Sequence, residues 1–218
     1  MNMKTGLVGA FRALLLDCDG VLVDSAVTAD LAWRLWADEL GLSRDEVLTA
    51  ARGRRVVEAV RRFVDEDSVA LEAERFEKLE LSLADGTRAC LGATSLTREI
   101  AAYGCWAVVT SAHRSVATAR LLAAGLPLPP VLIAAEDVSQ GKPAPDGFKE
   151  AAAALGVDAR ECLAFDDLEV GVAAAEASGA KALLVRVDAA AAGSISSLAD
   201  VHMEFSDGFV RVWTPSAD

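Results

Sequence analysis

The sequence predicts an α/β fold in which a parallel β-sheet is covered by helices on both faces and carries a helical insertion after its first strand. Two observations favour the sheet: short, almost continuous apolar segments alternate with alanine-rich segments of helical spacing, and a glycine follows each helical segment. A third favours the insertion, because residues 27–83 carry many charges, a helical period and few strand signals. A chain of 218 residues is long enough for one core with a small inserted domain.

The strands are predicted where five apolar runs stand in the sequence. In chain order these are ALLL at 13–16, WAVV at 106–109, VLIA at 131–134, CLAF at 162–165 and ALLVRV at 182–187. The predicted helices between the later strands lie at about 115–124, 146–155 and 170–178. Each of these helices is followed at once by a glycine, the residue that most often ends a helix. Alternation of strand and helix is typical of a sheet with parallel strands.

The helical insertion is predicted to be a separate small domain. Trp33 and Trp36 lie three residues apart, and the apolar residues between Val56 and Val64 form a stripe at helical spacing. We interpret these side chains as helix packing rather than as ligand contacts. The expected domain boundaries are residues 1–26 and 84–218 for the α/β core and residues 27–83 for the helical domain.

Composition and charge limit the partners of this chain. The formal net charge is −12, which disfavours sequence-independent binding of nucleic acid, because such binding requires Lys and Arg to neutralise phosphates. No apolar run reaches the length of a membrane span, and the apolar start is interpreted as the approach to the first core strand rather than as a signal peptide. The four cysteines show no CxxC spacing, which argues against a zinc site or a disulfide framework. We therefore expect a cytoplasmic monomer without nucleic-acid or membrane partners.

Polar side chains follow the predicted strands at the point where each strand ends. Because the carboxyl ends of parallel strands lie along one edge of a sheet, these residues are expected to meet in one crevice. Carboxylates, a hydroxyl and an ammonium group together indicate a divalent cation with a phosphoryl group. The residues are Asp17 and Asp19 after the first strand, Thr110 and Ser111 after the second, Lys142 in the loop SQGKPAPD, and Asp166 and Asp167 after CLAF.

A phosphoryl-transfer site explains why two carboxylates stand close together at the end of a buried strand. A Mg²⁺ ion between Asp17 and Asp167 would remove their repulsion, and Mg²⁺ prefers oxygen ligands. An aspartate can attack phosphorus to form an aspartyl phosphate, and Asp19 would protonate the leaving group and then activate water. Lys142 would neutralise charge on the phosphoryl oxygens, and Gly20 would permit the sharp turn that points Asp19 inward.

Taken singly, most of these residues have an ordinary structural explanation. The pattern Asp-x-Asp-Gly often forms a turn, a Ser or Thr after a strand often caps a helix, and Lys142 can be a surface lysine before a turn. Four such coincidences in this order, each at the end of a strand, favour the phosphoryl-transfer site over the separate explanations.

The same segments resemble the four motifs of the haloacid dehalogenase superfamily. DCDGVLVDS resembles the first motif, VVTSAHRS the second, GKPAPDGFKEAAAALGV the third and CLAFDDLEVGVAAAEASGA the fourth, in the expected order. The resemblance implies a Rossmann-like three-layer core with a small inserted α-helical cap. Within the small-cap subfamily, the sequence looks most like bacterial sugar and polyol phosphatases. The segments that carry this likeness are DCDGVLVDS, the GRR at 53–55 and VVTSAHRSVATARLLAAGLP. Asp19 marks a phosphatase or phosphomutase, because the dehalogenases of this superfamily lack the second aspartate.

The resemblance implies a role for each matched residue. Asp17 is the implied nucleophile, Asp19 the implied general acid and base, and Lys142 the cation beside the phosphoryl group. Ser111 and Ala112 join Lys142 in the implied phosphate-binding site. The implied Mg²⁺ ligands are Asp17, Asp19, Asp167 and Asp166, the last at a position that is commonly a glutamate in the family.

The cap is expected to select the substrate. Arg54 and Arg55 belong to a basic cluster in an acidic protein, and Glu80 lies beside the return linker. These three residues are therefore the expected substrate contacts. The ordinary explanation of a charge run such as the arginine cluster is a helix face exposed to solvent. The implied function is a Mg²⁺-dependent phosphatase that hydrolyses a small sugar or polyol phosphate through a phospho-aspartate. Two alternatives stay open: a β-phosphoglucomutase-like phosphotransferase, and a non-catalytic binding or regulatory protein on the same fold.

Overall fold

A six-stranded parallel sheet forms the centre of the molecule in the computed structural model, which describes residues 6–186 and 193–215. The strand order is β6-β5-β2-β7-β8-β9, and every neighbouring pair is parallel. The strands are β2 (Ala13–Leu16), β5 (Trp106–Val109), β6 (Val131–Ile133), β7 (Cys162–Asp166), β8 (Lys181–Val185) and β9 (Ser194–Ile195). The α/β class with a parallel sheet is therefore confirmed. Residue 187, the last of the predicted fifth strand, lies outside the described residues.

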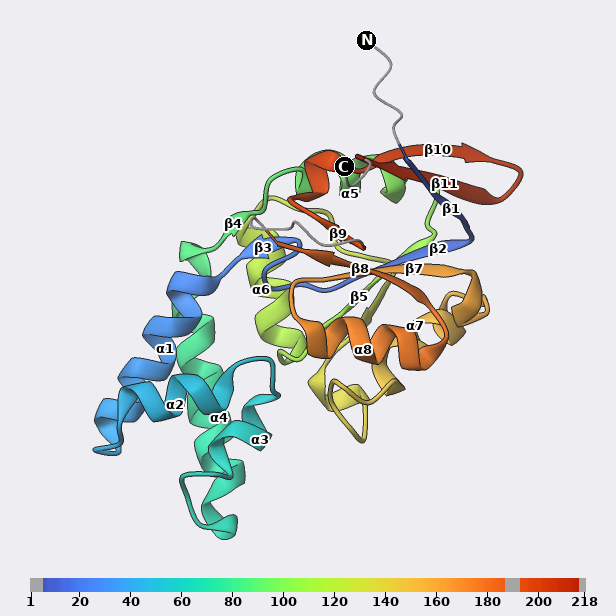
Figure 1. Cartoon of the computed structure of the whole chain (residues 1–218). Helices are drawn as coiled ribbons and strands as arrows, with labels where there is room; N and C mark the ends of the chain where they lie inside the picture. Colours follow the sequence, from blue (N-terminus) through green and yellow to red (C-terminus); the bar gives the residue numbers. More distant parts are fainter. Residues whose placement is uncertain (1–5, 187–192, 216–218) are drawn as a thin grey trace.

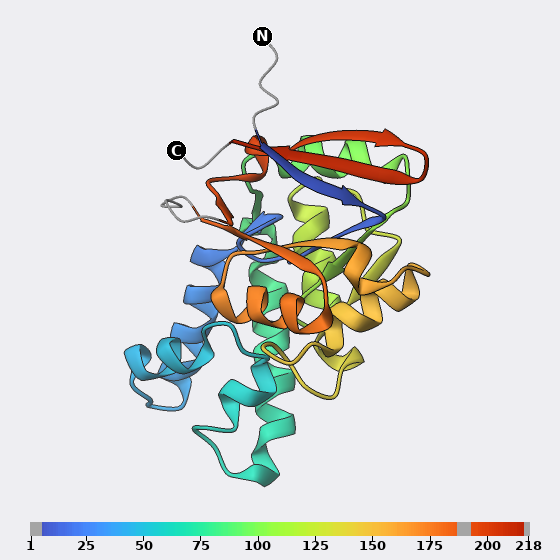
Figure 2. The same ribbon diagram turned by 45° about the vertical axis from the view of Figure 1, so that its right-hand side comes forward.

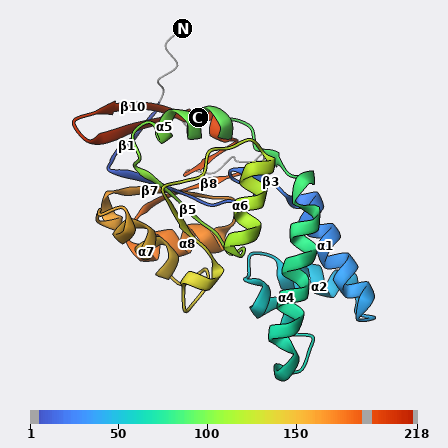
Figure 3. The same ribbon diagram turned by 180° about the vertical axis from the view of Figure 1, so that it is seen from behind.

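Helices cover both faces of this sheet, so that the core has three layers (Figures 1 and 3). On one face, α5 (Ala93–Ala101) and α6 (Arg114–Ala123) pack against the side chains of Leu14 and Leu16. On the other face, α7 (Asp146–Ala154) and α8 (Glu169–Ser178) pack against Leu15. Side chains along a strand alternate between the two faces, and here both faces are apolar, so β2, β5 and β7 are buried throughout.

A block of four helices, residues 26–83, interrupts the core after β2 (Figure 1). The helices are α1 (Ala26–Glu39), α2 (Arg44–Ala51), α3 (Val56–Val60) and α4 (Glu66–Leu83). They share their own hydrophobic cluster, in which the ring of Trp33 stacks on Phe76 with 3.7 Å between centroids. The indole of Trp36 donates a hydrogen bond of 3.0 Å to Glu72, which satisfies the polar atom of a buried ring. Both tryptophans therefore pack inside this helical block, as the helical spacing predicts.

The two connections between core and helical block lie side by side. β3 (Val23–Asp24) leads into α1, and β4 (Arg88–Ala89) returns from α4 through the short 3₁₀ helix η1 (Ala84–Gly86). The two strands pair in antiparallel fashion, with Val23 opposite Ala89 and Asp24 opposite Arg88.

A second sheet that the sequence analysis did not predict lies at the end of the core away from the helical block (Figure 2). β1 (Gly6–Phe11), β11 (Phe209–Thr214) and β10 (His202–Ser206) form it in the order β1-β11-β10, with antiparallel pairing. Asp207 and Gly208 join β10 to β11 with φ values of 53° and 76°. An Asp-Gly pair between alternating apolar residues is the usual signal of such a hairpin, and this signal was available in HMEFSDGFVRVW.

The four cysteines are free thiols that contribute to the core. Cys18 and Cys162 are buried, and Cys90 and Cys105 are half-buried. Burial raises the pKa of Cys162 to about 12, because an apolar surrounding disfavours the thiolate. No helix among the described residues combines the length and the apolarity needed to cross a membrane.

We expect Phe76→Ala to destabilise the helical block strongly, because the ring is fully buried and stacks on Trp33. Removal of a buried Phe typically costs about 3–5 kcal/mol in the free energy of unfolding. Urea unfolding followed by tryptophan fluorescence measures the loss. Leu71→Ala is the matched control on the same helix, because Leu71 is 59% exposed, and it should change this free energy by less than about 0.5 kcal/mol. Equal midpoints for the two variants would contradict the packing described here.

Candidate active site

The order of the central strands brings the predicted site residues together at one edge of the sheet. β2 lies between β5 and β7, so the residues that follow these three strands are neighbours in space. Asp17 follows β2 directly and its backbone N–H donates to the carbonyl of Phe165 at 2.9 Å. Asp166 ends β7, and both aspartates are buried. Two carboxylates from distant parts of the chain are thus held side by side by sheet pairing.

Lys142 lies between these two carboxylates. Its Nζ donates hydrogen bonds to Oδ1 of Asp17 at 2.6 Å and to Oδ2 of Asp166 at 2.7 Å, and it lies 3.3 Å from the carbonyl oxygen of Val109. The face of the Phe148 ring covers the ammonium group at 5.6 Å. Burial alone lowers the pKa of Lys142, but the carboxylates of Asp17 and Asp166 outweigh it and hold this pKa above the usual range. The lysine therefore stays charged.

Asp167 completes a cluster of three acids with room for a cation. Asp17, Asp166 and Asp167 each offer a carboxylate oxygen, and these oxygens lie within 4.8 Å of one another. Burial raises the pKa of Asp17 well above its usual value, and Asp166 and Asp167 raise it further. Burial and the charge of Asp166 likewise raise the pKa of Asp167 to about 6. The single charge of Lys142 leaves this negative charge only partly balanced, and an all-oxygen donor set of this kind fits Mg²⁺.

Two glycines allow the acids to come this close. A Cβ on Gly20, whose φ is +85°, would lie 2.3 Å from Oδ2 of Asp167. A Cβ on Gly171, at the start of α8, would lie 1.9 Å from Cγ of Asp166. Gly20 therefore serves the turn after Asp19 and also leaves the space that the carboxylate of Asp167 fills.

Asp19 faces a different set of partners from Asp17. Its Oδ1 accepts one hydrogen bond from the hydroxyl of Ser25 at 2.5 Å and another from Nη1 of Arg120 at 3.1 Å. Ser25 precedes α1, yet its side chain makes no capping hydrogen bond to that helix. Arg120 lies on α6 and also donates through Nη2 to Glu80 of α4 at 2.9 Å.

The residues after β5 complete the floor of the site. Thr110 accepts a hydrogen bond from the backbone N–H of Ala112 at 3.1 Å, and this small turn presents Ser111 between them. Ser111, Ala112 and Lys142 line the same cleft as the acids. The predicted phosphate-binding residues and the predicted acid residues therefore share one site.

A cleft of about 710 Å³ lies between this floor and the helical block. The floor contributes Asp17, Asp19 and Asp167, and the helical block contributes residues that include Arg54 and Glu80. A volume in this range is typical of pockets for small molecules.

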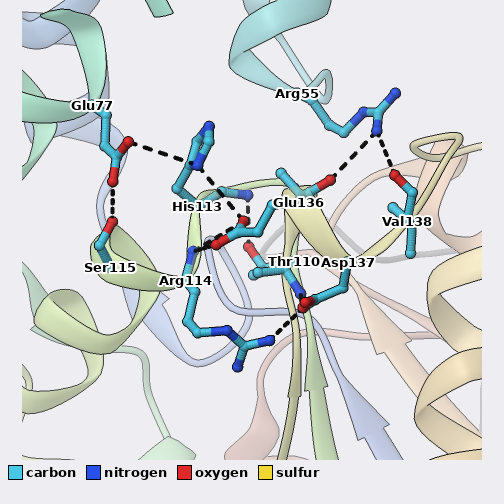
Figure 4. Close-up of polar contacts among 12 residues, drawn as sticks. Arg55, Glu77, Thr110, His113, Arg114, Ser115, Glu136, Asp137 and Val138 are labelled. Atoms are coloured by element: carbon cyan, nitrogen blue, oxygen red, sulfur yellow. Dashed lines mark hydrogen bonds and ion pairs between the residues drawn. The ribbon is translucent and has the colours of Figure 1, made fainter. Parts of the chain in front are cut away.

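Arg55 is placed differently from Arg54. Its guanidinium pairs with Glu58 at 2.5 Å and donates to the backbone carbonyl oxygen of Ser139 at 3.2 Å. It also donates to the backbone carbonyl oxygen of Val138 at 3.0 Å (Figure 4). These acceptors belong to the loop that precedes Lys142. The structure thus brings Arg54 and Glu80 to the cleft, whereas Arg55 joins the helical block to the core beside it.

A second contact between block and core lies around Glu77 of α4. Its carboxylate accepts a hydrogen bond from Ser115 and lies 3.8 Å from Nδ1 of His113, which itself lies 3.7 Å from Glu136 (Figure 4). His113 occupies the N-terminal cap position of α6, and its side chain makes no capping hydrogen bond to that helix.

The fold and this site define an α/β enzyme whose active centre lies at the carboxyl ends of parallel strands. The chain belongs to the haloacid dehalogenase-like hydrolases, since the model of that family matches residues 11–179. The chain is 37% identical to hexitol phosphatase A of Escherichia coli over 82% of this chain and 84% of that protein. It is 30% identical to the fructose-1-phosphate phosphatase YqaB of the same organism, over 81% of this chain and 97% of that protein.

Solved structures confirm the fold. CbbY from Rhodobacter sphaeroides, determined in complex with phosphate, superposes with a TM-score of 0.77 at 22% identity and covers 87% of this chain and 96% of its own. The resemblance to the haloacid dehalogenase superfamily, and within it to bacterial sugar and polyol phosphatases, is therefore confirmed.

Sequence reasoning missed Arg120. It lies in the last turn of α6, 101 residues from Asp19 and 40 from Glu80, and no strand end or motif spacing marks it. The one available signal was an arginine within the mostly apolar stretch VATARLLAAGLP.

We expect Gly20→Ala to be more harmful than the matched variant Gly156→Ala. Both positions have positive φ, so each alanine should cost roughly 1–2 kcal/mol in backbone strain. A Cβ at Gly156 meets nothing within 4 Å, whereas at Gly20 it meets the side chain of Asp167. The overlap should add about 1 kcal/mol or more to the loss in the free energy of unfolding. Urea denaturation of both variants measures the difference, and equal losses would show that Asp167 does not occupy the space beside Gly20.

Proposed function

We propose that this protein is a Mg²⁺-dependent phosphatase that hydrolyses a small sugar or polyol phosphate through a phospho-Asp17 intermediate. The observation that carries the proposal is the ammonium group of Lys142 between Asp17 and Asp166, with Asp167 beside them, on the floor of the cleft. A buried nucleophile, a fixed cation and an acidic cluster are the parts that phosphoryl transfer requires.

The enzyme class expected from the sequence, a phosphoric monoester hydrolase, is confirmed by the phosphatases among the relatives. The names of these relatives also support the substrate. Hexitol phosphatase and fructose-1-phosphate phosphatase act on phosphorylated polyols and sugars, and a third relative, from Streptomyces hygroscopicus, is a validoxylamine A 7′-phosphate phosphatase. The proposed substrate is therefore a phosphate ester of a small polyhydroxyl compound.

In the first step a carboxylate oxygen of Asp17 attacks the phosphorus atom. A new bond forms between this oxygen and phosphorus, and the bond from phosphorus to the leaving oxygen breaks. Lys142 neutralises negative charge on the phosphoryl oxygens, and the hydroxyl of Ser111 and the N–H of Ala112 serve as donors to the same group. Removal of one such donor from an active site typically reduces the rate by about 10²–10³-fold.

Asp19 moves the protons in both steps. It gives a proton to the leaving oxygen as the ester bond breaks, so that an alcohol rather than an alkoxide departs. In the second step it takes a proton from the water that attacks phosphorus, and the bond to Asp17 breaks to release phosphate. Phosphoryl transfer places the attacking and leaving oxygens in line, so Asp17 and Asp19 would address opposite sides of the transferred group.

The Mg²⁺ ion would be held by Asp17, Asp166 and Asp167. Asp19 is the fourth metal ligand expected from the sequence. When bound, the ion supplies positive charge beside the phosphoryl oxygens and balances the three acids.

The helical block supports the proposed division into a cap, residues 27–83, and a core, residues 1–26 and 84–218. Its helices share one hydrophobic cluster, and some of its residues line the cleft opposite Asp17. We assign a substrate contact to Arg54, which lines the cleft. Glu80, the second residue expected from the sequence to contact substrate, also borders the cleft, but its carboxylate is buried against Arg120. Arg55, the third residue expected from the sequence to contact substrate, would act through the loop before Lys142 that it binds.

A β-phosphoglucomutase-like phosphotransferase would use the same residues but would keep the phosphoenzyme long enough to return phosphate to a sugar. A non-catalytic protein would release no phosphate at all. Steady release of inorganic phosphate therefore separates the proposed phosphatase from both alternatives. The cytoplasmic location and the monomeric state stay predictions from the sequence.

We expect the wild type to release phosphate from at least one member of a panel of sugar, polyol and glycerol phosphates in Mg²⁺, and to lose this activity in chelator. Asp17→Asn should reduce turnover by about 10³-fold or more, because the amide cannot serve as the nucleophile. The melting temperature of this variant should stay near that of the wild type. Wild-type rates in Asp17→Asn would remove the nucleophile from the proposal.

We expect Mg²⁺ to raise the melting temperature of the wild type, because an ion that binds only the folded chain stabilises it by about 2.7 kcal/mol at 100 times its Kd. Asp167→Asn should reduce this rise sharply, since it removes one charged ligand. Asp158→Asn is the control, because Asp158 is paired with Arg160 and precedes the start of β7, whereas Asp166 ends that strand. A full response to Mg²⁺ in Asp167→Asn would contradict the metal assignment.

A further inference from the structure

Arg120 is a buried cation held between two carboxylates from separate parts of the chain. Only 3% of the residue is exposed, and its guanidinium donates to Asp19 at 3.1 Å through Nη1 and to Glu80 at 2.9 Å through Nη2. Glu80 is also buried, with 6% exposed. Withdrawal of such charges from water is costly, and a buried ion pair often adds little or nothing to stability.

The geometry of this pair is poorly suited to a purely structural role. Within the described part of the chain, Nε of Arg120 and Oε2 of Glu80 are both buried without a hydrogen-bond partner. Each such atom has lost its hydrogen bonds to water without gaining one in the folded chain, which is unfavourable. An apolar pair of similar size would join α6 to α4 without this cost.

The contacts of Arg120 fix the orientation of Asp19. The two donors to this carboxylate, Arg120 and Ser25, converge on Oδ1. No hydrogen bond to Oδ2 is found from residues within 6–186 and 193–215. The side chain is 30% exposed and lines the cleft, so Oδ2 is the oxygen left to meet a ligand there.

We propose that Arg120 is a positioning residue that, together with Ser25, holds Oδ1 of Asp19 so that Oδ2 exchanges the proton with the leaving group. The inference rests on the proposed phosphatase function and deepens it. Glu80 holds the other side of the guanidinium and thereby fixes the direction from which Nη1 approaches Asp19.

The same contacts connect the orientation of Asp19 to the helical block. Ser25 stands directly before α1, and Glu80 lies in the last turn of α4, so the two residues mark the two ends of the block. Asp19 is thus held from both ends of the inserted segment. Its proton-transfer geometry is complete only while the block occupies the position seen in this structure.

A comparison of leaving groups tests the proposal, because only poor leaving groups need a proton from Asp19. We expect Arg120→Met to lower kcat/KM for the best alkyl phosphate of the panel by about 10- to 100-fold. With p-nitrophenyl phosphate, whose phenolate departs readily, kcat/KM should stay close to the wild-type value. Asp19→Asn is the reference for this selective loss, and Arg114→Met, an arginine of the same helix paired with Asp137 at the surface, should leave both substrates unaffected.

Further variants keep the test decisive if Arg120→Met fails to fold. Arg120→Lys keeps the charge but has a single donor centre that cannot span both carboxylates, and Ser25→Ala removes the other donor to Oδ1. Both should show the same selective loss for the alkyl phosphate. An equal loss for both substrates, or no loss for either, would overturn the positioning role while leaving the phosphatase function intact. Absence of phosphate release by the wild type from any substrate would instead overturn the phosphatase proposal itself.

Discussion

The contact of Lys142 with Asp17 and Asp166 is the interaction on which the rest of the site depends. Carboxylates this close together in a buried place repel one another, and either protons or cations must balance them. One ammonium group at 2.6 and 2.7 Å from two of them supplies part of that balance. The strand order, the buried residues beneath the loops and the two glycines all serve to bring these charges together at a fixed separation. The remaining negative charge is what the proposed Mg²⁺ ion would balance.

The helical block is coupled to this charged centre through polar contacts rather than through a continuous apolar interface. Arg55 reaches the loop before Lys142, Glu77 reaches the start of α6, and Glu80 reaches Arg120. Each contact therefore ends on or next to a segment that carries a site residue. Polar contacts of this kind exchange readily with water, whereas separation of a packed apolar face would be far more costly. The arrangement suits a block that opens to admit a ligand and closes over it.

Much of the core and of the floor of the site could be predicted because local signals report them. ALLL, WAVV and CLAF are short apolar runs that end in polar residues, and such runs form buried parallel strands whatever the details of packing. Position at a strand end was enough to bring Asp17 and Asp166 together, whereas Lys142 reaches them from the loop between β6 and α7. The sheet of β1, β10 and β11 joins segments from opposite ends of the chain, so its pairing depends on long-range contacts. Arg120 shows the same limit, because its partners are set by how α6 packs, which no single sequence displays.

The pairing of β3 with β4 has a consequence for how such a protein can change. In an antiparallel pair the facing Cα atoms lie about 4.5–5.5 Å apart, so the helical block leaves and rejoins the core at nearly one point. A segment with adjoining ends behaves as a cassette: it can be lengthened, shortened or exchanged for another, or reduced to a tight turn, without redirecting the chain on either side. Chemistry and selectivity can then diverge at separate rates, with the acids and lysine retained in one part while the other is rebuilt for a new substrate.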